Sequence, residues 1–175
     1  TTLHTQGWGM DKVLLDYGSG GRASHRFVAD LFFKHLGNDI LARMDDAAVL
    51  SLTGPVAMST DSFVVDPIFF PGGDIGSLAV HGTVNDVAMM GARPLFLTCG
   101  FILEEGLPMD DLAKIVASMG QAASEAGVRV VAGDTKVVPR GAADKIFINT
   151  TGVGEILVDP APSGHRAAVG DVVIV

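Results

Sequence analysis

Hydrophobic residues along the chain follow two different periods, which predict a mixture of helices and strands. A helix is expected over about 23–36, because its apolar residues fall on one face and Gly37 follows as a stop. Two more helices are expected, one over about 75–90 and one from Pro108 to the residue before Gly127. The predicted strands are residues 46–52, 56–65, 95–103, 128–132 and 146–156. Because these elements mix without a strict βαβ repeat, we expect an α+β fold with helices on one face of a sheet.

Two adjacent carboxylates, Asp45 and Asp46, precede the first apolar strand. If Thr53 and Gly54 form a two-residue turn, strands 46–52 and 56–65 make a hairpin that places Asp46 opposite Asp61. Like charges directly opposite on a sheet destabilise it. Two solvated acids at a frayed edge are one explanation, and a divalent cation between them is the other.

Two further polar segments interrupt apolar elements. Asn85 and Asp86 lie inside a predicted helix whose other residues are Val, Ala and Met, and residues 133–136 follow a buried strand. One such segment is usually a cap or a turn, but three acidic segments beside buried elements suggest a cation site. Lys136 would then supply a fixed positive charge for a phosphate chain. The candidate metal ligands are Asp45, Asp46, Asp61, Asp86 and Asp134.

A glycine-rich segment precedes the first predicted helix. Gly18, Ser19, Gly20 and Gly21 stand where exposed backbone N–H groups and the helix dipole favour an anion. The segment matches neither of the common phosphate-binding glycine patterns, so alone it is equally consistent with a flexible loop. It indicates a phosphate site only in combination with the acidic segments elsewhere in the chain.

Composition narrows the function classes. The 175 residues are 48% hydrophobic, which is enough for one domain, or for one domain and part of another. A net charge of −8 without a Lys/Arg cluster argues against nucleic-acid binding, whereas 16 Asp against 4 Glu suits a protein that holds hard cations. We expect no membrane segment and no signal peptide. The single cysteine, Cys99, fits a reducing cytoplasm and lies in an apolar strand, where a buried structural thiol is expected.

Several motifs together resemble the HypE family of hydrogenase maturation proteins, in the superfamily of aminoimidazole ribonucleotide synthetase (PurM). They are "RMDDAAVL", "STDSFVVDPIFFPGGDIG", "GTVNDVAMMGARPLF", "GFILEEGLP" and "GVRVVAGDTKVVPRGAADKIFINTTGVGE". Thiamine-monophosphate kinase is similar in the Asp-Asp and Gly-Asp-Thr motifs, but "VNDVAMMGARP" is unlike its version. Selenophosphate synthetase would place a reactive cysteine near the first glycine-rich loop, where this chain has "DYGSGGR". The resemblance implies a mixed, largely antiparallel four-stranded sheet, which pairs with a second copy into a barrel in a homodimer.

The same resemblance implies a chemistry. HypE-like proteins use ATP and Mg²⁺ to dehydrate a thiocarbamoyl group on their own C-terminal cysteine to a thiocyanate, which supplies cyanide for the iron of [NiFe] hydrogenase. It implies cytoplasmic partners, namely the carbamoyltransferase HypF and the HypC–HypD complex. The five aspartates match the family's metal-binding motifs, and Lys136 is the expected catalytic residue beside the phosphates. The implied ATP-binding and phosphate-binding residues are Gly18, Ser19, Gly20, Gly21, Asn85, Gly133, Thr135 and Lys136.

Three segments are expected from the resemblance. They are an N-terminal extension (1–13), an ATP-binding and dimer-forming domain (14–157), and a linker with the first strand of a C-terminal domain (158–175). The sequence ends at "GDVVIV" without a terminal cysteine, so we expect it to be the N-terminal part of a longer protein. Two alternatives stay open. They are a small-molecule kinase or synthetase of the same superfamily, and a dimerisation or docking module without turnover.

Overall fold

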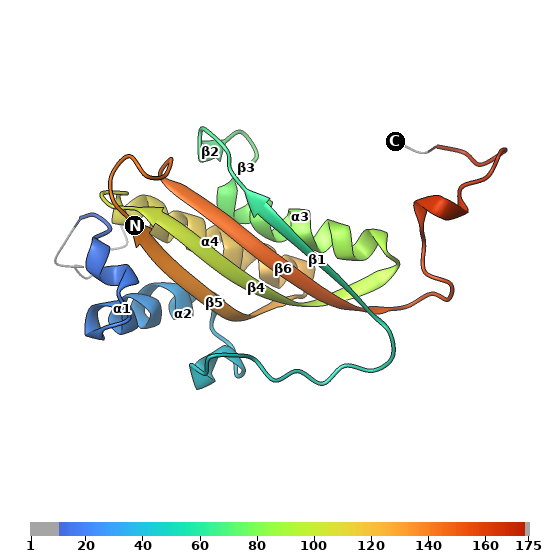
Figure 1. Cartoon of the computed structure of the whole chain (residues 1–175), viewed down its shortest axis with the longest axis horizontal. Helices are drawn as coiled ribbons and strands as arrows, with labels where there is room; N and C mark the ends of the chain where they lie inside the picture. The colour runs from blue at the N-terminus through green and yellow to red at the C-terminus, as the bar shows by residue number, and fades with distance from the viewer. Residues whose placement is uncertain (1–10, 174–175) are drawn as a thin grey trace, which may run out of the picture.

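Two long helices cover one face of a sheet in the computed structural model, which describes residues 11–173 (Figure 1). Helix α3 (Ile75–Met89) begins at Asp74, whose carboxylate accepts the backbone N–H groups of Gly76 and Ser77 at 2.7 and 3.0 Å. Helix α4 (Met109–Ala126) begins after a proline and ends where Gly127 adopts φ +68°. Both predicted helices are therefore confirmed.

The first predicted helix is confirmed as one continuous helical stretch over residues 22–36. It consists of α1 (Arg22–Phe27), a π-helical turn η2 (Val28–Phe32) and α2 (Phe33–Leu36). Gly37 ends it, because a Cβ at this position would lie 2.4 Å from a carbonyl oxygen of the preceding turn. A side chain there would force the backbone apart, so glycine marks the exit from the helix.

The sheet contains four strands in the spatial order β1-β6-β4-β5. Strand β6 pairs antiparallel with both of its neighbours, whereas β4 and β5 pair in parallel. The bounds are β1 (Val56–Phe63), β4 (Ala92–Glu104), β5 (Arg129–Val138) and β6 (Ile146–Ile156), with a small hairpin of β2 (Phe69–Phe70) and β3 (Gly73–Asp74). Short 3-10 turns are η1 (Leu15–Gly18), η3 (Leu41–Arg43) and η4 (Gly164–Arg166). The predicted α+β class and the mixed, largely antiparallel sheet are confirmed.

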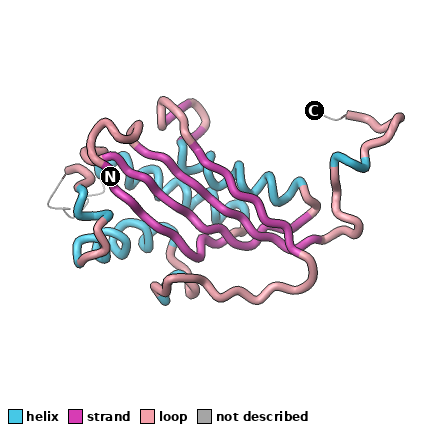
Figure 2. Tube along the Cα trace, viewed as in Figure 1, coloured by secondary structure: helices cyan, strands magenta, loops and turns pink. Residues whose placement is uncertain are grey.

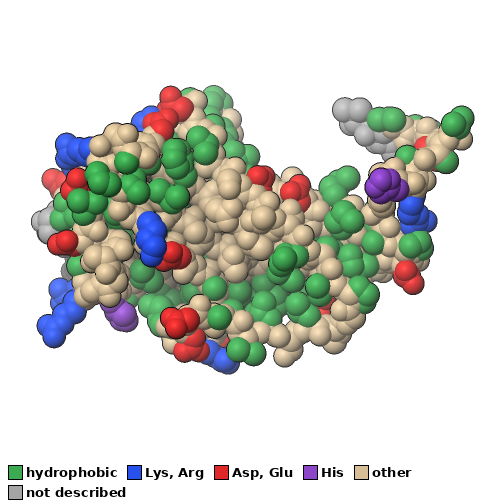
Figure 3. Space-filling model, in the orientation of Figure 1, with side chains coloured by type: hydrophobic (Ala, Val, Ile, Leu, Met, Phe, Trp, Pro, Cys, Tyr) green, Lys and Arg blue, Asp and Glu red, His purple; other side chains and the backbone are tan. Residues whose placement is uncertain are grey.

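The two faces of the sheet differ in what covers them. Alternate residues of β4, such as Leu97 and Phe101, point toward the helices and are buried. On the opposite face, which no described helix covers, Met58 is 72% exposed and Ile102 is 43% exposed (Figure 2). Few charged side chains lie in the middle of this face (Figure 3). The middle of this face can therefore be covered by a second apolar layer.

The predicted hairpin of 46–52 with 56–65 is wrong. Residues 44–55 form a loop that runs beside the sheet to the start of β1, and Asp61 lies opposite Thr150 of β6 (Figure 1). The presumed turn is bonded to the end of β6 instead, since the N–H of Thr53 donates to Glu155 and Pro55 accepts the N–H of Ile156. The long antiparallel partner offered by β6 outcompetes the short local one.

Two other predictions change in extent. Strand β5 continues to Val138, so residues 133–136 lie within the strand rather than after it. These polar residues are tolerated because β5 is an edge strand and Asp134 and Lys136 project into solvent. Beyond β6, residues 157–173 extend away from the sheet and contain no strand; Ile174 and Val175 of the predicted strand lie outside the described residues (Figure 1). Most of the predicted N-terminal extension, residues 1–10, also lies outside them.

Candidate functional site

A cavity of about 440 Å³ lies beside the edge strand β5, between that strand, the helical stretch 22–36 and the loop that follows it. We call it the β5-edge cavity. It brings together residues that are far apart in the sequence, from the glycine-rich turn, the Asp-Asp pair and the polar part of β5. The predicted site residues that line it are Gly18, Gly20, Asp45, Asp46, Gly133, Asp134, Thr135 and Lys136.

The glycine-rich turn is held against β5 by close backbone packing. A Cβ on Gly18 would lie 2.5 Å from the backbone nitrogen of Val137, so only glycine fits there. Gly20 adopts φ +81°, which favours glycine for a different reason. Its N–H donates to the Ser24 hydroxyl at 2.9 Å, and that hydroxyl donates to the carbonyl of Tyr17 at 2.7 Å. The turn is therefore ordered before any ligand binds.

These hydrogen bonds also limit which groups can contact an anion. The N–H of Gly20 is used by Ser24, and the Ser19 hydroxyl donates to the carbonyl of Asp16 at 2.8 Å. The N–H groups of the first helical turn after Gly21 have no intrahelical acceptors, as at any helix start. A phosphate at this turn would therefore accept hydrogen bonds from the backbone N–H groups of the first helical turn rather than from the Ser19 hydroxyl.

The polar end of the cavity carries more negative than positive charge. Asp45 and Asp46 are exposed on the loop, and the Lys136 ammonium pairs with the Asp134 carboxylate at 3.2 Å. Residues 134 and 136 are two apart on one strand, so their side chains project from the same face. With three carboxylates against one lysine, an anionic ligand would need a cation to bridge it to the acids.

The other end of the cavity is apolar, and it was not predicted as part of a site. Its wall contains Phe32, Phe101 and Cys99, which belong to the buried core between the first helices and the sheet. Burial raises the pKa of the Cys99 thiol, so the sulfur stays protonated and is a poor nucleophile. The expectation that Cys99 is a buried structural thiol is confirmed.

Three predicted residues lie away from this cavity, at the opposite edge of the sheet. Asp61 is on β1, and Asn85 and Asp86 are on α3, which packs against β1 and β6. Asp86 accepts a hydrogen bond from the Ser59 hydroxyl at 2.9 Å, and Asp61 accepts the N–H of Ser62 at 2.8 Å. Three inter-strand steps separate β1 from β5, about 14 Å at ordinary spacing.

The predicted metal site is therefore divided between two places in one chain. The pairing of Asp46 with Asp61, on which the prediction of a shared cation was first based, is absent because the hairpin does not form. Within residues 11–173, no three His, Cys, Asp or Glu side chains lie close enough together to hold a metal ion. Three of the five aspartates remain grouped around the β5-edge cavity.

The family described as AIR synthase related protein, N-terminal domain, matches residues 44–156. The chain belongs to this family. All five candidate aspartates lie inside the matched region, whereas the glycine-rich turn precedes it.

Several proteins that the chain resembles are named as hydrogenase expression, formation or maturation proteins. The carbamoyl dehydratase HypE of Azotobacter vinelandii is 57% identical over 160 residues, which cover 91% of this chain and 47% of that protein. A solved structure of HypE in complex with ATP is 75% identical with a TM-score of 0.88, covering 89% of this chain and 46% of the other. A structure of a HypE–HypF complex is 56% identical with a TM-score of 0.59, covering 79% and 43%. The chain thus spans about half the length of the relatives it matches.

No helix within residues 11–173 has both the length and the apolar character needed to cross a membrane.

Proposed function

We propose that this chain is the ATP-binding part of a HypE-type carbamoyl dehydratase and that ATP binds with Mg²⁺ in the β5-edge cavity. One observation carries the proposal: the cavity gathers an ordered glycine turn, a pair of carboxylates and the Asp134–Lys136 pair. The likeness to a HypE structure described as a complex with ATP supports it.

The residues at the polar end suit Mg²⁺. This ion prefers oxygen ligands, keeps several of its waters, and commonly uses only one or two carboxylates together with substrate phosphates. Asp45, Asp46 and Asp134 offer such oxygens from an exposed loop and a strand. A cation held by Asp134 would release Lys136 from its ion pair to face the phosphate chain.

The proposed reaction is the one named for the HypE relatives, the dehydration of a carbamoyl group. An amide oxygen is a poor leaving group, and ATP supplies the phosphoryl group that turns it into a good one. The proposed substrate is a thiocarbamoyl group carried on a C-terminal cysteine of the whole protein, and the product is a thiocyanate that provides cyanide for a [NiFe] hydrogenase. Cys99 does not serve as the carrier, because it is 2% exposed and its thiol stays protonated.

We further propose that the chain forms a homodimer through the uncovered face of the sheet. Exposed apolar side chains on that face, including Met58 and Ile102, would be buried by a second copy. We also propose that the protein acts in the cytoplasm, with HypF and the HypC–HypD complex as its partners. The HypE–HypF complex among the similar structures supports the first of these partners.

In a dimer, Asp61 and Asp86 at the β1 edge of one chain could contribute to the nucleotide site of the other chain. If Asp61 and Asp86 serve the same nucleotide as Asp134, they must come from the second chain, because one chain holds them at opposite sheet edges. Mixing Asp61→Asn chains with Asp134→Asn chains tests this. Random exchange should restore about a quarter of the ATP sites, since about half of the dimers are mixed and each has one intact site. If mixing restores no ATP sites, the two residues either have separate functions or act within the same chain.

Calorimetry tests the proposed function itself. The chain should bind ATP more tightly with Mg²⁺ than without it, and Lys136→Ala should weaken Mg-ATP binding by about tenfold, the size of one lost charge-assisted bond. Lys114→Ala is the matched control, because Lys114 is an exposed lysine paired with Asp111 on α4. If sedimentation shows a dimer that binds no ATP, the chain is a dimerisation module instead.

A further inference from the structure

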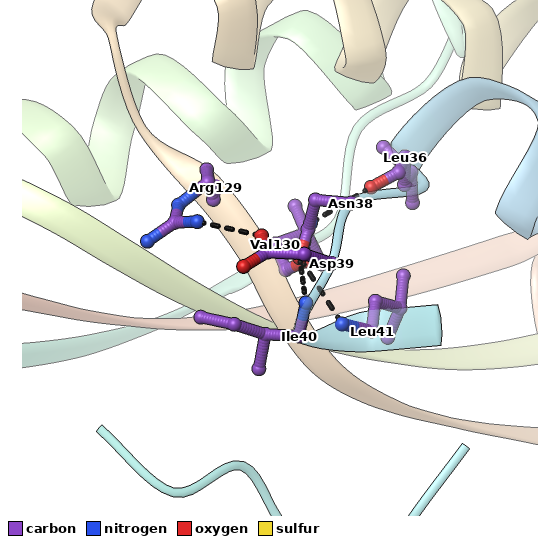
Figure 4. A network of polar contacts seen from close by, with 7 residues as sticks. All are labelled: Leu36, Asn38, Asp39, Ile40, Leu41, Arg129 and Val130. Carbon is purple, nitrogen blue, oxygen red and sulfur yellow. Dashed lines mark hydrogen bonds and ion pairs between the residues drawn. The ribbon is translucent and has the colours of Figure 1, made fainter. Parts of the chain in front are cut away.

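Asn38 follows Gly37 at the end of the first helical stretch, and its side chain forms four hydrogen bonds (Figure 4). Its side-chain amide nitrogen donates to the carbonyls of Val130 and Leu36 at 2.7 and 3.2 Å. Its side-chain oxygen accepts the backbone N–H groups of Ile40 and Leu41, both at 3.1 Å. A carboxamide has two N–H donors and two acceptor positions, so every one of them is used.

These bonds join two walls of the β5-edge cavity. Val130 is a buried residue of β5, on the strand that carries Asp134 and Lys136. Ile40 precedes the turn η3 and Leu41 begins it, and Met44 after the turn comes directly before the Asp-Asp pair. The carboxamide therefore fixes the start of the acidic loop to the strand across the cavity.

The far end of the same loop is held by a different contact. The N–H and the hydroxyl of Thr53 both donate to the Glu155 carboxylate, at 3.0 and 3.1 Å. Asp45 and Asp46 follow Leu41, the last residue whose N–H Asn38 accepts, by four and five residues, whereas they precede Thr53 by eight and seven. Their distance from Asp134 is thus controlled mainly at Asn38.

We infer that Asn38 is a positioning residue of the nucleotide site, which holds the Asp45–Asp46 loop at the distance from β5 that a bound cation requires. This inference rests on the proposed function, since it assigns the loop acids to Mg²⁺. An aspartate at this position would have nearly the same shape but would turn oxygen toward the carbonyls of Leu36 and Val130. Both donor bonds would be lost, and the loop would move away from the strand.

The chain provides a matched control at the next position. Asp39 is 78% exposed on its side chain and pairs with the Arg129 guanidinium at 2.8 Å. Asp39→Asn changes charge on the same loop and faces the same strand but leaves the Asn38 bonds in place. Exposed ion pairs of this kind contribute little to stability.

Two measurements on the 175-residue chain test the inference. In hydrogen exchange without ligand, Asn38→Asp should speed exchange at the hydrogen-bonded amides of residues 40–44 by about tenfold or more, whereas Asp39→Asn should not. In calorimetry, Asn38→Asp should weaken Mg-ATP binding by about tenfold and leave ATP binding without Mg²⁺ nearly unchanged. Unchanged exchange in the loop would overturn the inference, whatever happens to nucleotide binding.

A double-mutant cycle distinguishes a purely structural role of Asn38 from its positioning role in the nucleotide site. If Asn38 acts through the loop acids, Asn38→Asp and Asp46→Asn together should weaken Mg-ATP binding by less than the product of their separate effects. If the effects of the two substitutions on the Kd for Mg-ATP multiply, Asn38 contributes to stability alone. A lower melting temperature with an unchanged Kd for Mg-ATP would lead to the same conclusion. Asn38→Ala serves the same cycle if the aspartate variant does not fold. If the parent chain binds no Mg-ATP while loop exchange responds as expected, the proposed function fails and Asn38 remains the anchor of the loop.

Discussion

The two edges of the sheet carry the same kinds of residue in different surroundings. At the β5 edge, Asp134 and Lys136 pair with each other and line a cavity shared with the glycine turn. At the β1 edge, Asp61 and Asp86 accept hydrogen bonds from Ser62 and from Ser59, and neither lines that cavity. Similar acidic segments in the sequence thus have different contacts, and the order of the strands decides which of them meet.

The largest expected effect comes from the packing that forms the β5 edge. Gly18→Val should remove Mg-ATP binding and cost about 1–3 kcal/mol of stability, because its side chain would collide with the backbone of β5 at Val137. Gly164→Val is the control, since a Cβ at Gly164 meets nothing within 4 Å. Calorimetry and thermal unfolding measure both effects. Full nucleotide affinity in the Gly18 variant would remove the glycine turn from the site.

Asp74 differs from the acids at both sheet edges, because its role is structural. Asp74 is buried and caps α3, and the Ser118 hydroxyl also donates to its carboxylate at 2.6 Å. Asp74→Ala should cost about 2 kcal/mol, which lowers the melting temperature by about 4–8 °C, with Mg-ATP affinity unchanged in the folded state.

The control for this change is Asp110→Ala, an exposed acid in the first turn of α4. Its melting temperature should stay within about 2 °C of the parent chain, the effect expected of a surface charge near a helix start. A larger loss of affinity than of stability in Asp74→Ala would place that residue in the binding machinery.

The smallest effect concerns Cys99, under the cavity. Burial raises the pKa of its thiol above the unfolded value, so this group contributes stability that is present below about pH 8.5 and is lost as the pH rises further. Labelling with a thiol reagent at about pH 8, near the pKa of a free thiol, should follow the rate of unfolding, whereas the chain in denaturant should react at once. Rapid labelling of the folded chain would mean that the cavity opens to the sulfur.

Local signals were enough to predict much of the fold. The cap at Asp74, the glycine stops and the alternation of β6 each act over a few residues, and the predicted elements there agree with the structure. The partner of β1 could not be predicted in this way. It lies about ninety residues away, and the segment before β1 looks locally like a hairpin turn.

The residues of the site were predictable from local sequence, as the helices and strands were, but their arrangement in space was not. The glycine turn and the acidic segments were recognised from residue type, but their division between two sheet edges depends on strand order. Asn38 and Ser24 were missed for a similar reason. Asn38 acts through the carbonyl of Val130, 92 residues away, and nothing in its local sequence indicates that contact.

We propose that the β5-edge cavity holds the cation and the nucleotide. The most direct measurement is paramagnetic broadening of backbone amide resonances by Mn²⁺ with ATP, which reports proximity to the metal residue by residue. We expect the strongest broadening at residues 45–46 and 133–136, with any effect at residues 59–62 arising only when the chain is dimeric. Broadening centred on residues 59–62 and 85–87, with the cavity amides unaffected, would contradict it.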